Sequence, residues 1–255
     1  MFLPLHDGVP LKNMKTPLAT RCLIALCIVV YGLTFYGPLG EDEMVGGLAF
    51  IPSVLFGTEV LPDGYPFVPV ELTLATNIFL HGSLFHLIGN MLFLWVFGDN
   101  VEDAMGHLRF VAFFLLCGIA ASLAHAFITP EPHRPLIGAS GGVSGVVAAY
   151  LILYPRVKIW GLFLKGIPLH LPAYWTIGFW FALQFISAFL GGTTASAGSR
   201  ILAASSWALF SLPSCGAATI PCSRASRRRS CRRRADDQGS TVVPQKWIPL
   251  CGSML

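Results

Sequence analysis

The sequence predicts an all-α, polytopic membrane protein. Hydrophobic residues make up 54% of the chain and charged residues 12%, about half the charged share of a soluble domain. Apolar runs recur along the first two thirds, and each approaches the roughly 20 residues that cross a bilayer as a helix. The expected helices lie near residues 19–37, 76–98, 108–129, 138–154 and 171–190, within a membrane domain that spans 18–192. A weaker apolar run at 201–220 is a sixth helix candidate. We assign residues 193–220 to a degenerate sixth helix, one whose apolar pattern is incomplete.

The distribution of charge predicts the orientation. Residues 1–17 contain three prolines, and basic residues precede or begin the first apolar run. This pattern is typical of an uncleaved first anchor with a cytoplasmic N-terminal segment. The loop 38–75 contains six acids and no Lys or Arg, so it is expected outside, lying against the membrane interface. Arg156, Lys158 and Lys165 follow the fourth run and are expected inside.

A glycine-rich serine element opens the fourth run. Ser140 is surrounded by glycines four residues apart, Gly138 with Gly142 and Gly141 with Gly145. Glycines at this spacing share a helix face and allow a second helix to approach closely. The serine is therefore either a filler in a helix-packing face or a nucleophile whose helix lies close to another that carries a base.

Polar side chains also interrupt the second apolar run. His86 and Asn90 are four residues apart, so they share a helix face, and His81 stands at the expected entrance of the same helix. The two side chains are either an interhelical polar clamp or part of a functional site, since polar groups within a bilayer are costly. His125 is expected to be a packing residue, and the acids of 98–110 are expected to be caps and turn formers.

Taken together, these motifs resemble the rhomboid intramembrane serine proteases of the bacterial type. They are H-x-x-x-x-H-x-x-x-N in the second run, G-x-x-x-E-x-x-x-G (Gly98, Glu102, Gly106) after it, and G-A-S-G two helices later. The resemblance covers about residues 18–190. It implies a bundle of six core helices in the bacterial inner membrane, with a water-filled cavity that opens outward.

The resemblance also implies roles for individual residues. Ser140 matches the nucleophile, and His86 and Asn90 match the oxyanion side. His81, Gly138 and Gly141 match supporting positions. The implied substrates are other membrane proteins, cut within or near a transmembrane segment. Serine chemistry of this kind implies no cofactor and no metal, and the seven cysteines show no metal-ligand spacing.

One part of the family pattern is missing. The family's general base is a histidine in the last core helix, and this chain has no histidine after His170. From about residue 199 the composition changes: arginines crowd together, serine is frequent, and no helical period continues. Residues 221–255 are therefore expected to be a disordered basic tail. The change is either a true divergence or a shift of the coding frame near residues 196–200, which the other two frames of the gene would reveal.

Three functions remain open from the sequence. The first is an intramembrane serine endopeptidase that is impaired because it lacks its base. The second is a non-catalytic relative that binds the transmembrane helices of client proteins. The third, a transporter or structural bundle, is disfavoured because the chain has no inverted repeat and no paired intramembrane acids. The lipid bilayer is the expected surrounding, and a nucleic-acid partner is not, because the net charge of +4 comes largely from the tail.

Overall fold

The computed structural model describes residues 2–129, 131–163, 167–178 and 181–182. The chain divides into two compact units, Met1–Cys215 and Gly216–Leu255, and every described residue belongs to the first unit. Its longer helices are α1 (Leu18–Tyr36), α5 (Leu84–Met105), α6 (His107–Ile128) and α7 (Ser140–Leu153). Shorter helices between α1 and α5 are α2 (Glu41–Leu48), α3 (Pro52–Leu55), η1 (Val70–Leu72), α4 (Thr73–Thr76) and η2 (Asn77–Phe79). The strands are β1 (Phe2–His6), β2 (Lys158–Phe163) and β3 (Ile167–Pro172).

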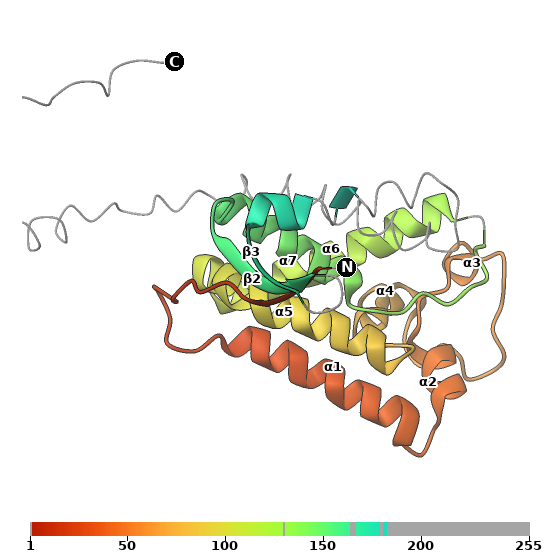
Figure 1. Ribbon diagram of the computed structural model, residues 1–255. Helices are drawn as coiled ribbons and strands as arrows, with labels where there is room; N and C mark the ends of the chain where they lie inside the picture. The colour runs from red at the N-terminus through yellow and green to blue at the C-terminus, as the bar shows by residue number, and fades with distance from the viewer. Residues whose placement is uncertain (1, 130, 164–166, 179–180, 183–255) are drawn as a thin grey trace, which may run out of the picture. The chain divides into compact units, whose positions relative to one another are not determined.

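Among the described residues, α1, α5 and α6 are long and apolar enough to cross a membrane, and α7 is a shorter apolar helix. The described part of the chain is therefore mostly helical and polytopic, as predicted. Helix α5 packs against α1 on one side and α7 on the other, and α6 packs against α7 (Figure 1).

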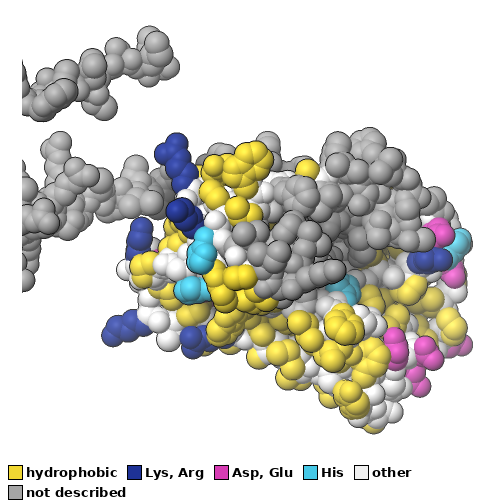
Figure 2. Space-filling model, in the orientation of Figure 1, with side chains coloured by type: hydrophobic (Ala, Val, Ile, Leu, Met, Phe, Trp, Pro, Cys, Tyr) yellow, Lys and Arg dark blue, Asp and Glu magenta, His cyan; other side chains and the backbone are white. Residues whose placement is uncertain are grey.

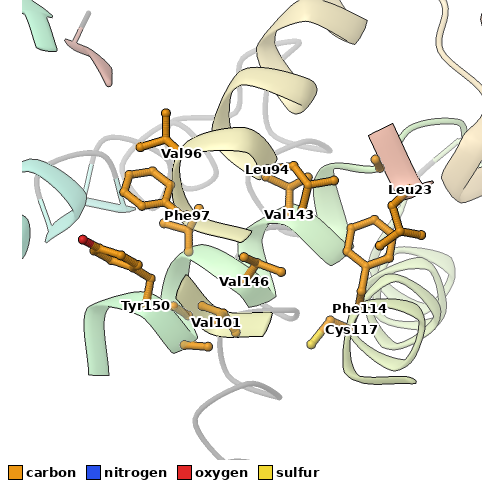
Figure 3. Close-up of a cluster of buried hydrophobic side chains, with 14 of the residues drawn as sticks. Leu23, Leu94, Val96, Phe97, Val101, Phe114, Cys117, Val143, Val146 and Tyr150 are labelled. Carbon is orange, nitrogen blue, oxygen red and sulfur yellow. The ribbon is translucent and has the colours of Figure 1, made fainter. Parts of the chain in front are cut away.

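The core lies where these four helices meet (Figure 3). Phe97 of α5, Phe114 of α6 and Tyr150 of α7 are each fully buried, and smaller side chains fill the space between them. Burial of one such large side chain contributes roughly 1.5–3 kcal/mol. The core therefore fixes the positions of α5, which carries His86 and Asn90, and of α7, which begins at Ser140.

A buried carboxylate joins α1 to the end of α5. Glu102 accepts hydrogen bonds from the backbone N–H groups of Ala19 (2.8 Å) and Thr20 (2.7 Å), and it also pairs with His107. The first N–H groups of a helix have no intrahelical partner, and Pro17 at the cap of α1 offers no side-chain bond. Glu102 therefore caps a helix distant in the sequence, which agrees with the expectation that acids here act as caps.

Two more acids fasten the N-terminal segment to the same end of the bundle. Asp103 accepts the backbone N–H groups of Lys12 (2.9 Å), Asn13 (2.8 Å) and Met14 (2.8 Å). Asp7, only 8% exposed, accepts from the Asn100 side chain at 2.6 Å and from the Tyr150 hydroxyl at 2.8 Å. Residues 7–14 are thus held across the ends of α5 and α7.

The strands form a three-stranded antiparallel sheet in the order β1–β2–β3. The sequence analysis assigned no strand to these residues. β1 pairs with a segment more than 150 residues away, for example Phe2 with Phe163, so no local sequence pattern predicts the pairing. Strands β2 and β3 have six residues each, and so short an alternation of side chains is a weak signal for a strand.

Two predicted helix boundaries were wrong. The second helix was expected at 76–98, but α5 runs from Leu84 to Met105. The apolar residues before it form α4 and η2, and the chain turns extended at Leu80 before Ser83 caps α5 by accepting the N–H of His86. The fifth helix was expected at 171–190, but residues 171–172 belong to β3 and helix is present at 173–178. Residues 183–190, the sixth helix at 193–220 and the tail lie outside the described residues.

Candidate active site

Ser140 is the first residue of α7 and is half-buried. The N–H groups of a first helical turn have no partner within the helix and point beyond its N-terminal end. They carry partial positive charge, which favours a negative group at this end. The carbonyl oxygen of Ser140 accepts the Ser144 hydroxyl at 2.6 Å, so the neighbouring serine is already engaged one turn along. Of these two serines, Ser140 is therefore the one whose hydroxyl lies at the start of the helix.

The glycines of α7 let it lie close to α6. A Cβ added to Gly141 would stand 2.7 Å from the Ala121 Cβ, and one added to Gly142 would stand 2.9 Å from the Phe114 carbonyl oxygen. A Cβ on Gly145 would overlap the Cys117 side chain. Gly141 and Gly145 therefore share a packing face, as their spacing predicts.

Gly138 has a different role from the one its spacing suggested. It precedes α7 and has φ +123°, so it does not share a helix face with Gly142 and that prediction was wrong. A Cβ here would stand 2.7 Å from His86 Cε1 and 3.0 Å from His86 Nε2. The chain two residues before Ser140 thus lies directly against the imidazole of His86, and any side chain at 138 would push the two apart.

His81 and Asn90 extend the polar surface around His86. His81 lies in the turn before α5, not on the helix itself, and is 1% exposed. Its Nδ1 is 3.2 Å from the Phe79 carbonyl oxygen, and its ring centroid is 5.3 Å from that of His86. Asn90, one turn along α5, is 8% exposed. Among the described residues, the Asn90 Nδ2 has no hydrogen-bond partner, and buried amides of this kind are rare enough to suggest a use.

The structure adds Asn77, which the sequence analysis did not single out. Its carbonyl oxygen accepts the Gly138 N–H at 2.9 Å. Its side chain donates to the Thr73 carbonyl oxygen at 2.7 Å and accepts from Ser122 of α6 at 3.3 Å. Asn77 therefore ties the loop that enters α7 to two other elements. A polar residue within an apolar run was the available signal.

The described residues contain no group of three or more His, Cys, Asp or Glu side chains that could hold a metal ion. The structure brings the Gly138 loop, which leads into Ser140, against His86, and it packs Gly141 against α6. A direct contact of Ser140 with His86 or Asn90 stays a prediction.

Comparison with known proteins identifies the family. Residues 71–211 match the rhomboid domain, which is more than half of the chain. The chain belongs to the rhomboid family. The match includes α5, α6 and α7 and runs past residue 199, where the composition changes. Membership in this family and the three candidate spans make the chain an integral membrane protein.

Curated relatives of this rhomboid include a protein named as a protease and one named as inactive. It is similar to the rhomboid protease GluP of Bacillus subtilis, 36% identical over 123 residues that cover 47% of this chain and 23% of the relative. It is similar to the mitochondrial rhomboid protein 1 of Saccharomyces cerevisiae, 32% identical over 49% of this chain and 37% of the relative. It also resembles the inactive rhomboid protein 1 of Drosophila melanogaster, 32% identical over 35% of this chain and 6% of the relative. The matches thus span well under half of these relatives' lengths.

A second polar cluster joins the loop that contains Ser53 and Glu59 to the loop that leads into α7. Glu59 accepts from the Ser53 hydroxyl at 2.6 Å and lies 2.8 Å from His133 Nδ1. A backbone bridge between Phe50 and Leu136 joins the same two loops. The hydrogen bond from Ser53, and then that from His133, lowers the pKa of Glu59 below its usual value of 4.5. This cluster holds residues 131–136, which lead into Ser140.

Glu59→Gln is expected to make the fold less sensitive to acid. A carboxylate whose folded-state pKa is lowered stabilises the fold above its unfolded pKa, and this contribution disappears as pH falls through the folded pKa. The variant should melt slightly lower than the parent at pH 7 and lose less stability than the parent between pH 6 and pH 3. Melting curves in detergent across this range measure both effects. Glu131→Gln, at an exposed pair with Arg134, is the control; equal acid sensitivity of the parent and Glu59→Gln would contradict the assignment.

Proposed function

We propose that this rhomboid is an intramembrane serine endopeptidase by descent that engages transmembrane segments of other membrane proteins but is impaired in hydrolysis. The observation that carries the proposal is the contact between the Gly138 loop and His86. It supports a site in which Ser140 and the oxyanion-side residues His86 and Asn90 act on one substrate carbonyl. His81 and Gly138 support this geometry, and Gly141 supports the position of the helix.

The proposed chemistry is acyl transfer. The Ser140 hydroxyl would attack the scissile carbonyl, and the charge that develops on its oxygen would be met by the N–H groups at the start of α7 and by His86 and Asn90. One donor of this kind is worth about 3 kcal/mol in other serine hydrolases. Hydrolysis also needs water, which the polar site within an apolar bundle would admit.

The impairment follows from the proton that Ser140 must lose. A serine hydroxyl is a weak nucleophile unless a general base accepts its proton. In the family that base is a histidine of the last core helix, and this chain has no histidine after His170. His86 could serve only by giving up its place on the oxyanion side.

A non-catalytic binder of transmembrane helices is the second candidate. The missing base and the similarity to an inactive rhomboid of Drosophila melanogaster support it. The retained Ser140, His86 and Asn90 favour the enzyme. In both cases the partner is a membrane protein within a lipid bilayer. The basic inner loops and the similarity to a Bacillus protein support a bacterial plasma membrane with a cytoplasmic N-terminus.

A fluorophosphonate probe separates the two candidates. Residual nucleophilicity should give slow labelling of the full chain that disappears in Ser140→Ala and persists in Ser144→Ala. Ser144 is the matched control because its hydroxyl is held by the Ser140 carbonyl one turn along the same helix. In parallel, a transmembrane peptide with a photo-crosslinker tests capture of a client. Capture without any Ser140 labelling would favour the binder, and labelling that survives Ser140→Ala would contradict the assigned nucleophile.

A further inference from the structure

The exposed face of the β-sheet carries a row of aromatic rings across its three strands. His6 of β1 pairs with Trp160 of β2, which pairs with His170 of β3. Directly paired residues project from the same face of a sheet. Trp160 is 37% exposed, its ring centroid is 6.4 Å from that of His170, and both histidines are exposed. On the other face, Ile159 is completely buried in the core. The sheet thus presents one face to the bundle and one outward.

Unpaired cations surround this face. The start of α1, the end of α5 and the start of α6 meet here, because Glu102 and Asp103 at the end of α5 hold the start of α1 and residues 12–14. The exposed cations of this end are Lys12, Lys15, Arg21, Arg109, Arg156 and Lys158. Over the part of the chain that is described, none of them forms an ion pair. In the view of Figure 2, most of the Lys and Arg side chains lie at the left, and the Asp and Glu side chains lie at the right with one cation among them.

The acids at this end form no ion pair with the exposed cations among the described residues. Asp7, Glu102 and Asp103 are buried and accept hydrogen bonds from backbone N–H groups, Asn100, Tyr150 and His107. Asp99 is half-buried and accepts the N–H of Asn100. The carboxylates are therefore withdrawn from the surface, whereas the Lys and Arg side chains stay exposed on it.

From this arrangement we infer that the outward face of the sheet and its surrounding cations bind the headgroups of anionic phospholipids. The face lies at the ends of the candidate membrane spans, where a bilayer's headgroups would be. Exposed Trp160, Tyr174 and Trp175 are the side chains that settle at the boundary between lipid and water. Clustered Lys and Arg next to a span attract anionic lipid. The exposed Trp160 and Trp175 favour a lipid surface over a soluble acidic partner, because such a partner would bind the cations without contacting these rings.

Native mass spectrometry of the full chain in detergent tests this inference, with phosphatidylglycerol and phosphatidylcholine as the lipids. Each cation removed should weaken phosphatidylglycerol binding about fivefold, so Arg156→Gln/Lys158→Gln should bind it about 25-fold more weakly. Lys12→Gln/Lys15→Gln, in a different segment, should show a similar loss. Arg134→Gln, at the opposite end, is the matched control and should bind as the parent does. Binding of phosphatidylcholine should not change in any charge variant.

Three results would overturn the lipid assignment. The first is phosphatidylglycerol affinity within about twofold of the parent in both double variants, against the fivefold expected per charge. The second is an equal loss for both lipids, which would mean that charge is not what the face recognises. The third is displacement by a soluble polyanion. A poly-glutamate peptide that displaces all phosphatidylglycerol would show that the face binds soluble acidic chains instead. Lipid binding is measured without a substrate, so its failure would leave the proposed peptidase site untouched.

Discussion

A transmembrane substrate is expected to be cut at least about 10⁴-fold more slowly by this chain than by a competent rhomboid protease such as GluP. In serine proteases, loss of the base removes about four to six orders of magnitude in rate, because the hydroxyl is then no longer activated. What remains comes from binding and from oxyanion donors. The measurement is cleavage of one labelled substrate that GluP cuts, reconstituted with each protein in the same lipid.

Control variants show whether any residual cleavage belongs to the proposed site. Any part of it in which the Ser140 hydroxyl still attacks the carbonyl should disappear in Ser140→Ala and persist in Ser144→Ala. Asn90→Ala should reduce it by about 10²–10³-fold if the carboxamide meets the oxyanion. Cleavage that depends on Ser140 and proceeds within about 100-fold of GluP would show that a base is present after all, since its loss alone costs far more.

The features that the sequence predicted well are those that composition and spacing control locally. Apolar runs long enough to cross a bilayer become α1, α5 and α6 because no other structure satisfies the backbone there. The contact of Gly141 and Gly145 with α6 follows from helical periodicity alone. His86 and Asn90 share one face of α5 for the same reason.

The features that the sequence analysis missed depend on partners far along the chain. The start of α5 is set by the Ser83 cap, whereas the apolar residues before it read as continuous helix. Gly138 resembled a helical glycine by spacing, but the hydrogen bond from its N–H to Asn77 draws it into the loop against His86. The strand at residues 2–6 forms only when β2 is in place. Contacts of this kind require the fold and cannot be read from a window of residues.

Glu102→Ala is expected to cause the largest loss of stability of any single substitution where the start of α1 meets the end of α5. Glu102 is 0% exposed, and its loss leaves the N–H groups of Ala19 and Thr20 without their acceptor. A buried group that loses its partner costs about 1–3 kcal/mol, and an unfilled helix cap costs about 1 kcal/mol. The sum, about 2–4 kcal/mol, is a large part of the stability of a typical domain. The melting temperature should fall by about 10 °C.

His107→Ala separates the cap from the contact between Glu102 and His107. This side chain is 48% exposed, and its removal leaves both backbone hydrogen bonds to Glu102 in place, so the melting temperature should fall by no more than about 3 °C. Glu102→Gln retains an acceptor for one N–H but turns an NH₂ donor toward the other, so its loss should lie between the two. If Glu102→Ala melted no lower than His107→Ala, α1 would not depend on the carboxylate. The glutamate of the G-x-x-x-E-x-x-x-G motif would then need a role other than holding the first span to the helix that carries His86 and Asn90.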